Sequence, residues 1–287
     1  MTRRPIVERF NRAILRPPFS GERCHKGWLE RWSKAQPHLV RRIALEIAGW
    51  PRFEKPQRIV FIADLHVGSH AGDIDRFAGI MMEAAGFAPD LILFGGDYVN
   101  MSTFGGGRIP PHVIASLMGR AVAPLGRFAV LGNHDYIYGA RDVASALRDA
   151  GITLLDHDRR SVEFRGETID ILGLPDTYVG EPDGQPLNAR LRPARPSIVL
   201  AHDPAWFAHM PEGPYLMLAG HTHGGQIRLP GIGILTNASR APRHWSHGLI
   251  IERNRHLYVT AGLGTSGLPL RIGVPPEYAV LDLNGTM

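Results

Sequence analysis

The sequence predicts an α/β fold in which two mixed sheets pack together with helices outside them, a four-layer α/β/β/α sandwich. In the first half, three apolar runs alternate with three helical patterns, and this alternation favours βαβ units with parallel strands. The runs lie at 59–63, 91–94 and 128–131, and the helical patterns near 73–86, 111–122 and 140–150. The second half is richer in strands, which are predicted at 152–155, 161–164, 168–172, 197–201, 215–219, 226–229, 248–251, 256–260 and 278–283.

The composition is that of a globular protein large enough to bury a core. The chain has 287 residues, of which 44% are hydrophobic and 21% are charged, and these values are ordinary for a soluble domain. Cys24 is the only cysteine. An internal disulfide and a thiolate-rich zinc site are therefore excluded.

The positive charge is concentrated at the N-terminus. Residues 1–55 contain 13 Lys and Arg against 5 Glu, although the whole chain has a net charge of only +5. Apolar residues recur there at intervals of three and four, which favours amphipathic helices, divided at Pro37. We therefore predict a basic amphipathic helical extension, residues 1–56, and a main domain, residues 57–287.

Two interpretations of the extension remain open. It either packs on the main domain or lies on a membrane through residues 1–50, with its arginines at anionic head groups. No apolar run approaches the ~18 residues that span a bilayer, and no apolar segment follows the paired arginines at positions 3 and 4. A cytoplasmic location is expected, and the extension adds the inner face of the membrane as an alternative.

Metal-binding residue types follow five of the predicted strands. Because ligands bind at the carboxyl ends of strands in open α/β sheets, these side chains are expected to meet at one edge. Imidazoles and carboxylates without thiolates suit Mn, Fe, Zn or Co. The clusters are Asp64-Leu-His66, Gly95-Gly-Asp97, Gly132-Asn-His-Asp135, Ala201-His202 and Gly220-His-Thr-His-Gly-Gly-Gln226.

In this order and spacing the sequence resembles the calcineurin-like metallophosphoesterases. The pattern of that family is D-x-H, GD, GNH[DE], H and GH-x-H, and every block is present between Asp64 and His223. The GHTHGGQ form is typical of a bacterial phosphodiesterase branch. So is the tail, with Gly262-Leu-Gly-Thr-Ser, Leu270-Arg-Ile and Pro275-Pro-Glu-Tyr.

The resemblance implies a centre of two divalent ions, with manganese as the first expectation and Fe, Zn or Co as alternatives. Asp97 would bridge the ions, and His134 would be the catalytic residue beside the phosphate. The first ion would take Asp64, His66 and His223, and the second would take Asn133, His202 and His221.

The sequence departs from part of the family at Asn100. Phosphoprotein phosphatases have an aspartate at this position that orients the catalytic histidine, so Asn100 would accept a hydrogen bond from His134 without adding charge. Phosphoprotein substrates are therefore disfavoured. Asp135 is expected either to orient an imidazole or to cap the helix that follows it.

The resemblance implies a metal-dependent phosphoric ester hydrolase, a phosphodiesterase or pyrophosphatase in which a hydroxide between the ions attacks phosphorus. Together with the basic extension it favours a membrane-associated, lipid-linked substrate such as UDP-diacylglucosamine. One alternative is a nuclease or cyclic-nucleotide phosphodiesterase whose extension holds nucleic acid. Another is a non-catalytic metal-binding scaffold.

Overall fold

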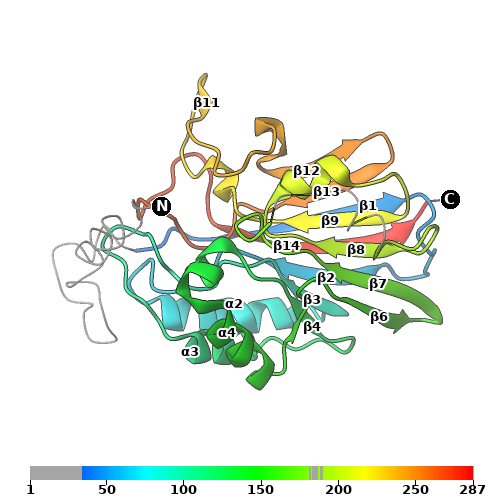
Figure 1. The fold of residues 1–287 in the computed structure, drawn as a ribbon, viewed down its shortest axis with the longest axis horizontal. Helices are drawn as coiled ribbons and strands as arrows, with labels where there is room; N and C mark the ends of the chain where they lie inside the picture. Colours follow the sequence, from blue (N-terminus) through cyan, green and yellow to red (C-terminus); the bar gives the residue numbers. More distant parts are fainter. Residues whose placement is uncertain (1–33, 181, 183–186, 188–189, 287) are drawn as a thin grey trace.

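The computed structural model describes residues 34–180, 182, 187 and 190–286. Two six-stranded sheets form its centre (Figure 1). The first has the order β1 (Leu39–Ile47), β14 (Glu277–Gly285), β2 (Gln57–Ile62), β3 (Leu91–Phe94), β4 (Arg127–Ala129) and β5 (Thr153–Leu154). The second has the order β12 (Gly248–Glu252), β13 (Arg255–Val259), β9 (Tyr215–Ala219), β8 (Ser197–Leu200), β7 (Glu167–Gly173) and β6 (Arg159–Phe164).

Both sheets mix parallel and antiparallel pairs. In the first, β2, β3, β4 and β5 are parallel, whereas β14 runs antiparallel to β2. In the second, β7, β8, β9 and β13 are parallel, and the hairpins β6–β7 and β12–β13 are antiparallel. The predicted pair of mixed sheets is confirmed. The β12–β13 hairpin turns at residues 253 and 254, between the predicted strands 248–251 and 256–260.

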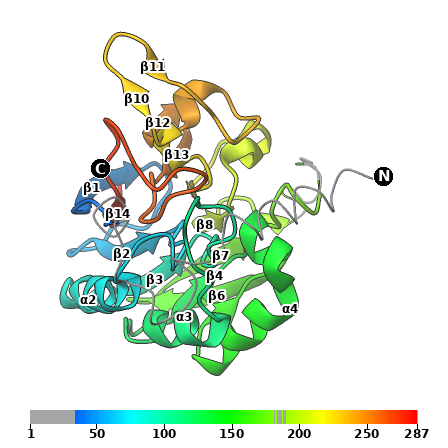
Figure 2. The same ribbon diagram turned by 90° about the vertical axis from the view of Figure 1, so that its left-hand side faces the viewer.

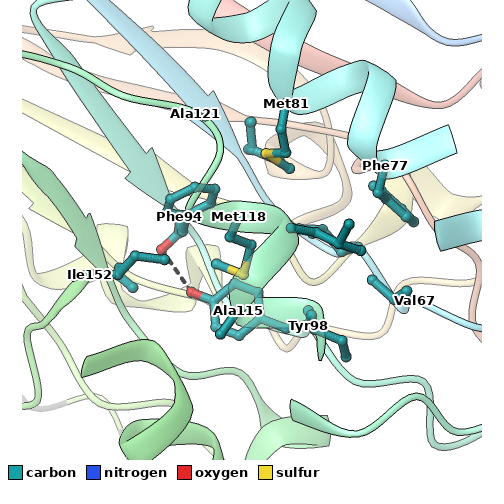
Figure 3. Close-up of a cluster of buried hydrophobic side chains, with 14 of the residues drawn as sticks. Val67, Phe77, Met81, Phe94, Tyr98, Ala115, Met118, Ala121 and Ile152 are labelled. Carbon is teal, nitrogen blue, oxygen red and sulfur yellow. Dashed lines mark hydrogen bonds between the residues drawn. The ribbon is translucent and has the colours of Figure 1, made fainter. Parts of the chain in front are cut away.

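Helices cover the outer face of the first sheet (Figure 2). They are α2 (Asp73–Gly86), α3 (Pro111–Met118) and α4 (Asn133–Asp149). Phe77 and Met81 of α2 and Met118 of α3 pack with Phe94 of β3 and with Tyr98, whose hydroxyl donates to the Phe94 carbonyl at 3.2 Å (Figure 3). Burying such side chains contributes about 1.5–3 kcal/mol each, which fixes the helices on the sheet.

A second apolar layer lies between the sheets, and a third lies on the outer face of the second sheet. The layer between the sheets includes Phe61, Leu93 and Leu281 from the first sheet and Ile171 and Leu218 from the second. Among the described residues, the outer face of the second sheet is covered by short 3-10 helices, not by long α-helices. These are η1 (Pro204–His209) and η3 (Arg243–Trp245), and a third, η2 (His223–Gly225), follows β9.

The helical prediction is wrong for residues 39–47, which form strand β1. This strand pairs in parallel with β14 from Leu39 opposite Glu277 to Ile47 opposite Gly285. Its inward side chains include Ile43, Leu45 and Ile47, at an interval of two. The predicted boundary between residues 56 and 57 therefore falls between two strands of one sheet. The helices predicted within residues 1–33 lie outside the described residues.

Candidate metal centre

The seven predicted metal ligands lie together at the carboxyl ends of five strands, of which three are parallel neighbours in the first sheet and two are parallel neighbours in the second. Asp64 and His66 follow β2, Asp97 follows β3, and Asn133 starts α4 after β4. His202 follows β8, and His221 and His223 follow β9. Three groups bring donor atoms within 4.8 Å of one another: Asp64, His66 and His223; His66, Asp97 and His134; and Asp97, His202 and His221.

Asp97 lies between the two sets of imidazoles. Its Oδ2 is 3.2 Å from His202 Nε2 and 3.6 Å from His66 Nε2. On one side, the Nε2 atoms of His66 and His223 are 3.2 Å apart, and on the other His221 Nδ1 is 3.2 Å from His202 Nε2. Facing ring nitrogens grouped around one carboxylate form a donor set that suits divalent ions.

The remaining predicted ligand, Asn133, also fits a metal. Asn133 Oδ1 is buried and has no hydrogen-bond partner among the described residues, so a cation would satisfy it. Burial lowers the pKa of His66 to about 3, which leaves a neutral imidazole. Burial acts against ionisation of Asp97, but the charge of His202 and its hydrogen bond to the carboxylate outweigh it and hold the pKa of Asp97 well below its usual range. His66 and Asp97 are therefore in the forms that bind metals, a neutral imidazole and an ionised carboxylate. By contrast, the charge of Asp97 outweighs burial and raises the pKa of His202, and burial raises the pKa of Asp64 to about 6, so metal binding would displace protons from these two ligands.

Neighbouring groups hold these ligands in place. His202 Nδ1 is 2.7 Å from the Gly95 carbonyl, an acceptor that fixes the proton on Nδ1 and turns Nε2 toward Asp97. The Asp135 carboxylate accepts from the backbone N–H of Asp97 at 2.8 Å and of Gly132 at 3.0 Å. Asp135 thus caps α4 and fixes the Asp97 loop, and its hydrogen bonds with the described residues go to backbone N–H groups, not to an imidazole.

The backbone at the site is strained. Among the described residues, eleven non-glycine residues have positive φ, and five of them are predicted ligands: Asp64, His66, Asp97, His221 and His223. The left-handed region costs a non-glycine residue about 1–2 kcal/mol. Such strain clusters at functional sites, where the surrounding structure enforces it.

Asn100 has a different role from the predicted one. Its Oδ1 accepts from the Thr103 N–H at 3.1 Å, and its Nδ2 donates to the Gly107 carbonyl at 2.9 Å. The ring Nδ1 of His134 is buried without a partner among the described residues. Asn100 therefore shapes the loop after β3 and does not orient His134. Burial lowers the pKa of His134, so a neutral ring stands beside the predicted ligands.

Sequence reasoning missed the part that Arg271 plays. Its guanidinium is buried and donates to the carbonyls of Ala261, Gly262 and Gly264, at 2.6, 3.2 and 2.6 Å, and to that of His223 at 3.2 Å. Its Nη2 also lies 3.1 Å from His223 Nδ1. Arg271 thus joins the loop after β13 to a predicted ligand. Only the Leu270-Arg-Ile motif in the tail marks this residue in the sequence.

A pocket of about 530 Å³ opens beside the predicted ligands. Asn133 and His221 are in its wall, together with Asp176, whose Oδ2 is buried without a partner among the described residues. Burial raises the pKa of Asp176. Sequence reasoning did not identify Asp176 as a residue of the site. The rest of the wall combines apolar and polar side chains. The apolar ones include Ala205, Ala208, Ala241, Pro242 and Trp245, and the polar ones include Thr177, Asp203, His209 and Arg240.

Comparison with known proteins gives one family. The model of the family described as calcineurin-like phosphoesterase matches residues 57–225. The chain is 32% identical to phosphodiesterase YaeI of Escherichia coli over 91% of this chain and 90% of that protein. It is 30% identical to the metallophosphoesterase YkuE of Bacillus subtilis, covering 80% of this chain and 79% of that one. It is 27% identical to the UDP-2,3-diacylglucosamine pyrophosphatase LpxG of Chlamydia trachomatis, covering 78% and 82%.

Proposed function

This chain belongs to the calcineurin-like phosphoesterase family and is a metal-dependent phosphoester hydrolase, and we propose that it cleaves phosphodiester or pyrophosphate bonds at a centre of two metal ions. The observation that carries the proposal is the grouping of the predicted ligands around Asp97. Asp64, His66 and His223 would hold one ion and Asn133, His202 and His221 the other, with Asp97 shared. Manganese is the ion we propose first.

The chain's own residues would prepare the site for one phosphate group. Bound divalent ions supply a nucleophile from water and neutralise charge at phosphorus. The backbone N–H of His134 donates to Asp97 Oδ1 at 2.8 Å, which holds this residue beside the predicted metal ligands. The neutral ring of His134 can donate a hydrogen bond to a phosphate oxygen. The pocket beside Asn133 and His221 has room for the organic group of an ester.

We further propose a lipid-linked nucleotide as the substrate, of the type of UDP-diacylglucosamine. The apolar part of the pocket wall, which includes Pro242 and Trp245, supports an acylated group. The similarity to LpxG, a UDP-2,3-diacylglucosamine pyrophosphatase, supports the same class. We also propose that residues 1–50 add a peripheral contact with the inner face of the membrane, because of their basic charge. Among the described residues, the helices lack the length and apolar character needed to cross a bilayer.

The first experiment measures hydrolysis of bis-p-nitrophenyl phosphate by the full chain with Mn²⁺ and after chelation. We expect turnover with the ion and none without it. Asp97→Asn removes the shared carboxylate and should lower turnover by about a thousandfold or more. The amount of bound metal, measured by mass spectrometry, should also fall. Asp142→Asn, an exposed position on α4, is the matched control and should behave as the wild type. Full activity of Asp97→Asn would contradict the shared role.

The substrate class is tested separately. The enzyme with Mn²⁺ is given UDP-diacylglucosamine in detergent, a cyclic nucleotide or single-stranded DNA, and the products are identified by mass spectrometry. Release of UMP from the first supports the lipid-linked proposal. Cleavage of the cyclic nucleotide or the DNA with no release of UMP would refute it without affecting the metal centre.

A further inference from the structure

A group of exposed apolar side chains lies on a hairpin and a loop that project from the second sheet. The hairpin consists of β10 (Arg228–Leu229) and β11 (Gly233–Ile234) and stands clear of the sandwich in both views (Figures 1 and 2). The loop 266–272 runs beside it. Ile232, at the hairpin turn, is 70% exposed. We call the group the apolar rim, and it comprises Ile232, Leu235, Leu268, Leu270 and Ile272, each at least 41% exposed.

Hydrogen bonds join the hairpin and the loop into one surface. The Arg228 N–H donates to the Ile272 carbonyl at 2.8 Å, and the Ile272 N–H donates to the Gln226 carbonyl at 3.0 Å. The Gln226 side chain donates to the Leu268 carbonyl at 3.0 Å. Exposed apolar side chains scattered singly are ordinary, but a connected group of large ones marks an interaction site.

A basic pocket lies at the base of the hairpin. It has a volume of about 290 Å³, and Arg228, Arg243, His244 and His247 contribute to its wall beside Ile232. Both histidines face glutamates, at 3.1 Å for His244 and Glu252 and at 2.8 Å for His247 and Glu277. Within the part of the chain that the structure describes, the two arginine side chains form no hydrogen bond or ion pair. They are thus the cations available to an incoming anion.

From residue 213 to 276 the sequence contains one acidic residue, Glu252, which lies outside the hairpin and the loop 266–272. From residue 213 to 251 and from 253 to 276 the chain has neither Asp nor Glu, so the hairpin and the loop present only positive or neutral side chains. Apolar side chains that project beyond arginines match a bilayer, in which an acyl region lies beneath anionic head groups. A polar protein surface or nucleic acid would match the arginines but would leave the apolar rim unpaired.

From these observations we propose that the apolar rim and the basic pocket bind the surface of a membrane containing anionic phospholipid. The apolar rim would enter the boundary between head groups and acyl chains, and Arg228 and Arg243 would hold a lipid phosphate. Gln226, which links the two segments, comes three residues after His223. The predicted metal centre would thus face the membrane. This inference deepens the proposed function, but it is tested by binding alone and does not depend on hydrolysis.

The experiment measures flotation of the full chain with vesicles of phosphatidylcholine alone or mixed with phosphatidylglycerol. We expect binding only to the mixed vesicles. Ile232→Glu should weaken it by about tenfold or more, since a charge replaces an inserted side chain. Arg228→Ser and Arg243→Ser should each weaken it by about fivefold. Circular dichroism and thermal unfolding of the same preparations show that each variant is folded.

Matched controls keep the test specific. Met82→Glu replaces a side chain that is 67% exposed on α2, and Arg141→Ser replaces an exposed arginine on α4; both should bind vesicles as the wild type does. If Ile232→Glu binds as tightly as wild type, the membrane contact lies elsewhere, for example in residues 1–33, and the proposal is wrong. The proposal is also wrong if the wild type binds neither kind of vesicle. A change of oligomeric state in the Ile232→Glu variant would then mean that the apolar rim is an interface between copies of this chain.

Discussion

At the scale of single residues, the site depends on backbone conformations that its side chains do not favour. Five of the seven predicted ligands have positive φ, at a combined cost of several kcal/mol. Each follows a buried strand whose pairing fixes where the turn begins. The paired strands therefore hold the donor atoms together, and folding of the sheets provides the free energy that offsets the strain.

Gly132 shows how closely the backbone approaches these donors. A methyl group there would overlap the Asp97 carboxylate at Oδ1. We therefore expect Gly132→Ala to displace Asp97 and to lower hydrolysis of bis-p-nitrophenyl phosphate by about a hundredfold, with less bound metal. The control is Gly79→Ala in the exposed face of α2, where a methyl group meets nothing within 4 Å. That variant should keep its activity and gain about 0.5–1 kcal/mol in free energy of unfolding.

A substitution of Arg271 can separate the effect of its hydrogen bonds to several carbonyls from the effect of its positive charge. Arg271→Lys keeps the charge but cannot reach the carbonyls of Ala261, Gly262, Gly264 and His223 together. We expect a loss of about 2–3 kcal/mol in free energy of unfolding, measured with urea, and weaker binding of Mn²⁺ by calorimetry. Arg228→Lys, at an exposed arginine, should change neither quantity. Wild-type affinity for Mn²⁺ in Arg271→Lys would show that the loop positions His223 without the guanidinium.

At the scale of elements, local pattern predicted the strands and helices whose apolar residues have one clear periodicity. The prediction of a helix at 73–86 agrees with α2 because its apolar face repeats every three to four residues. Residues 39–47 fit two periodicities. Ile43 and Ile47 are four apart, as in a helix, but Ile43, Leu45 and Ile47 also alternate, as in a strand. Pairing with β14, more than 230 residues away in the chain, decides between them, and no local pattern contains that information.

Glu277 connects β14 to its neighbours and makes their association depend on pH. Its buried carboxylate accepts from Arg41 of β1 at 2.7 Å and lies 2.8 Å from His247 Nε2. Burial opposes ionisation, but the hydrogen bond and charge of His247 and the bond from Arg41 outweigh it and lower the pKa of Glu277 from 4.5 to about 2. This carboxylate therefore stabilises the fold above about pH 4.5, by at most about 3 kcal/mol, and the contribution is lost as the pH falls toward 2.

Because the pKa of Glu277 is lowered, we predict that substituting this residue destabilises the fold more at neutral pH than at acidic pH. Glu277→Gln should lower the free energy of unfolding at pH 7 by about 2 kcal/mol, and the difference from wild type should shrink as the pH falls below 4.5. Urea unfolding followed by circular dichroism at several pH values measures both quantities. Glu46→Gln, at an exposed position on β1, is the control. A difference from wild type that stays constant down to pH 3 would mean that the lowered pKa of Glu277 does not stabilise the fold.

At the scale of the whole molecule, the grouping of the predicted ligands could be expected from the sequence, because the parallel strands within each sheet end at the same edge and each cluster follows such a strand. Other features depend on three-dimensional contacts that cannot be predicted from the spacing of residues in the sequence. Arg271 reaches the site only through the path of the loop 261–272, and Asn100 turns away from His134 because Thr103 and Gly107 bind its amide. The basic pocket between the hairpin and η3 likewise exists only once the second sheet has formed.

The division of the chain into an extension and a domain leads to the last prediction. β1 places Leu45 and Ile47 in the layer between the sheets, and Trp50 follows them there. Removing residues 1–50 exposes that layer and the edge of β14, at a cost of more than about 5 kcal/mol, so we expect a fragment of residues 51–287 to unfold at low urea and lose hydrolysis. A fragment of residues 34–287 retains β1 and should match the full chain in both. Equal stability of the two fragments would instead support the predicted boundary between residues 56 and 57, and β1 would then be a replaceable edge strand.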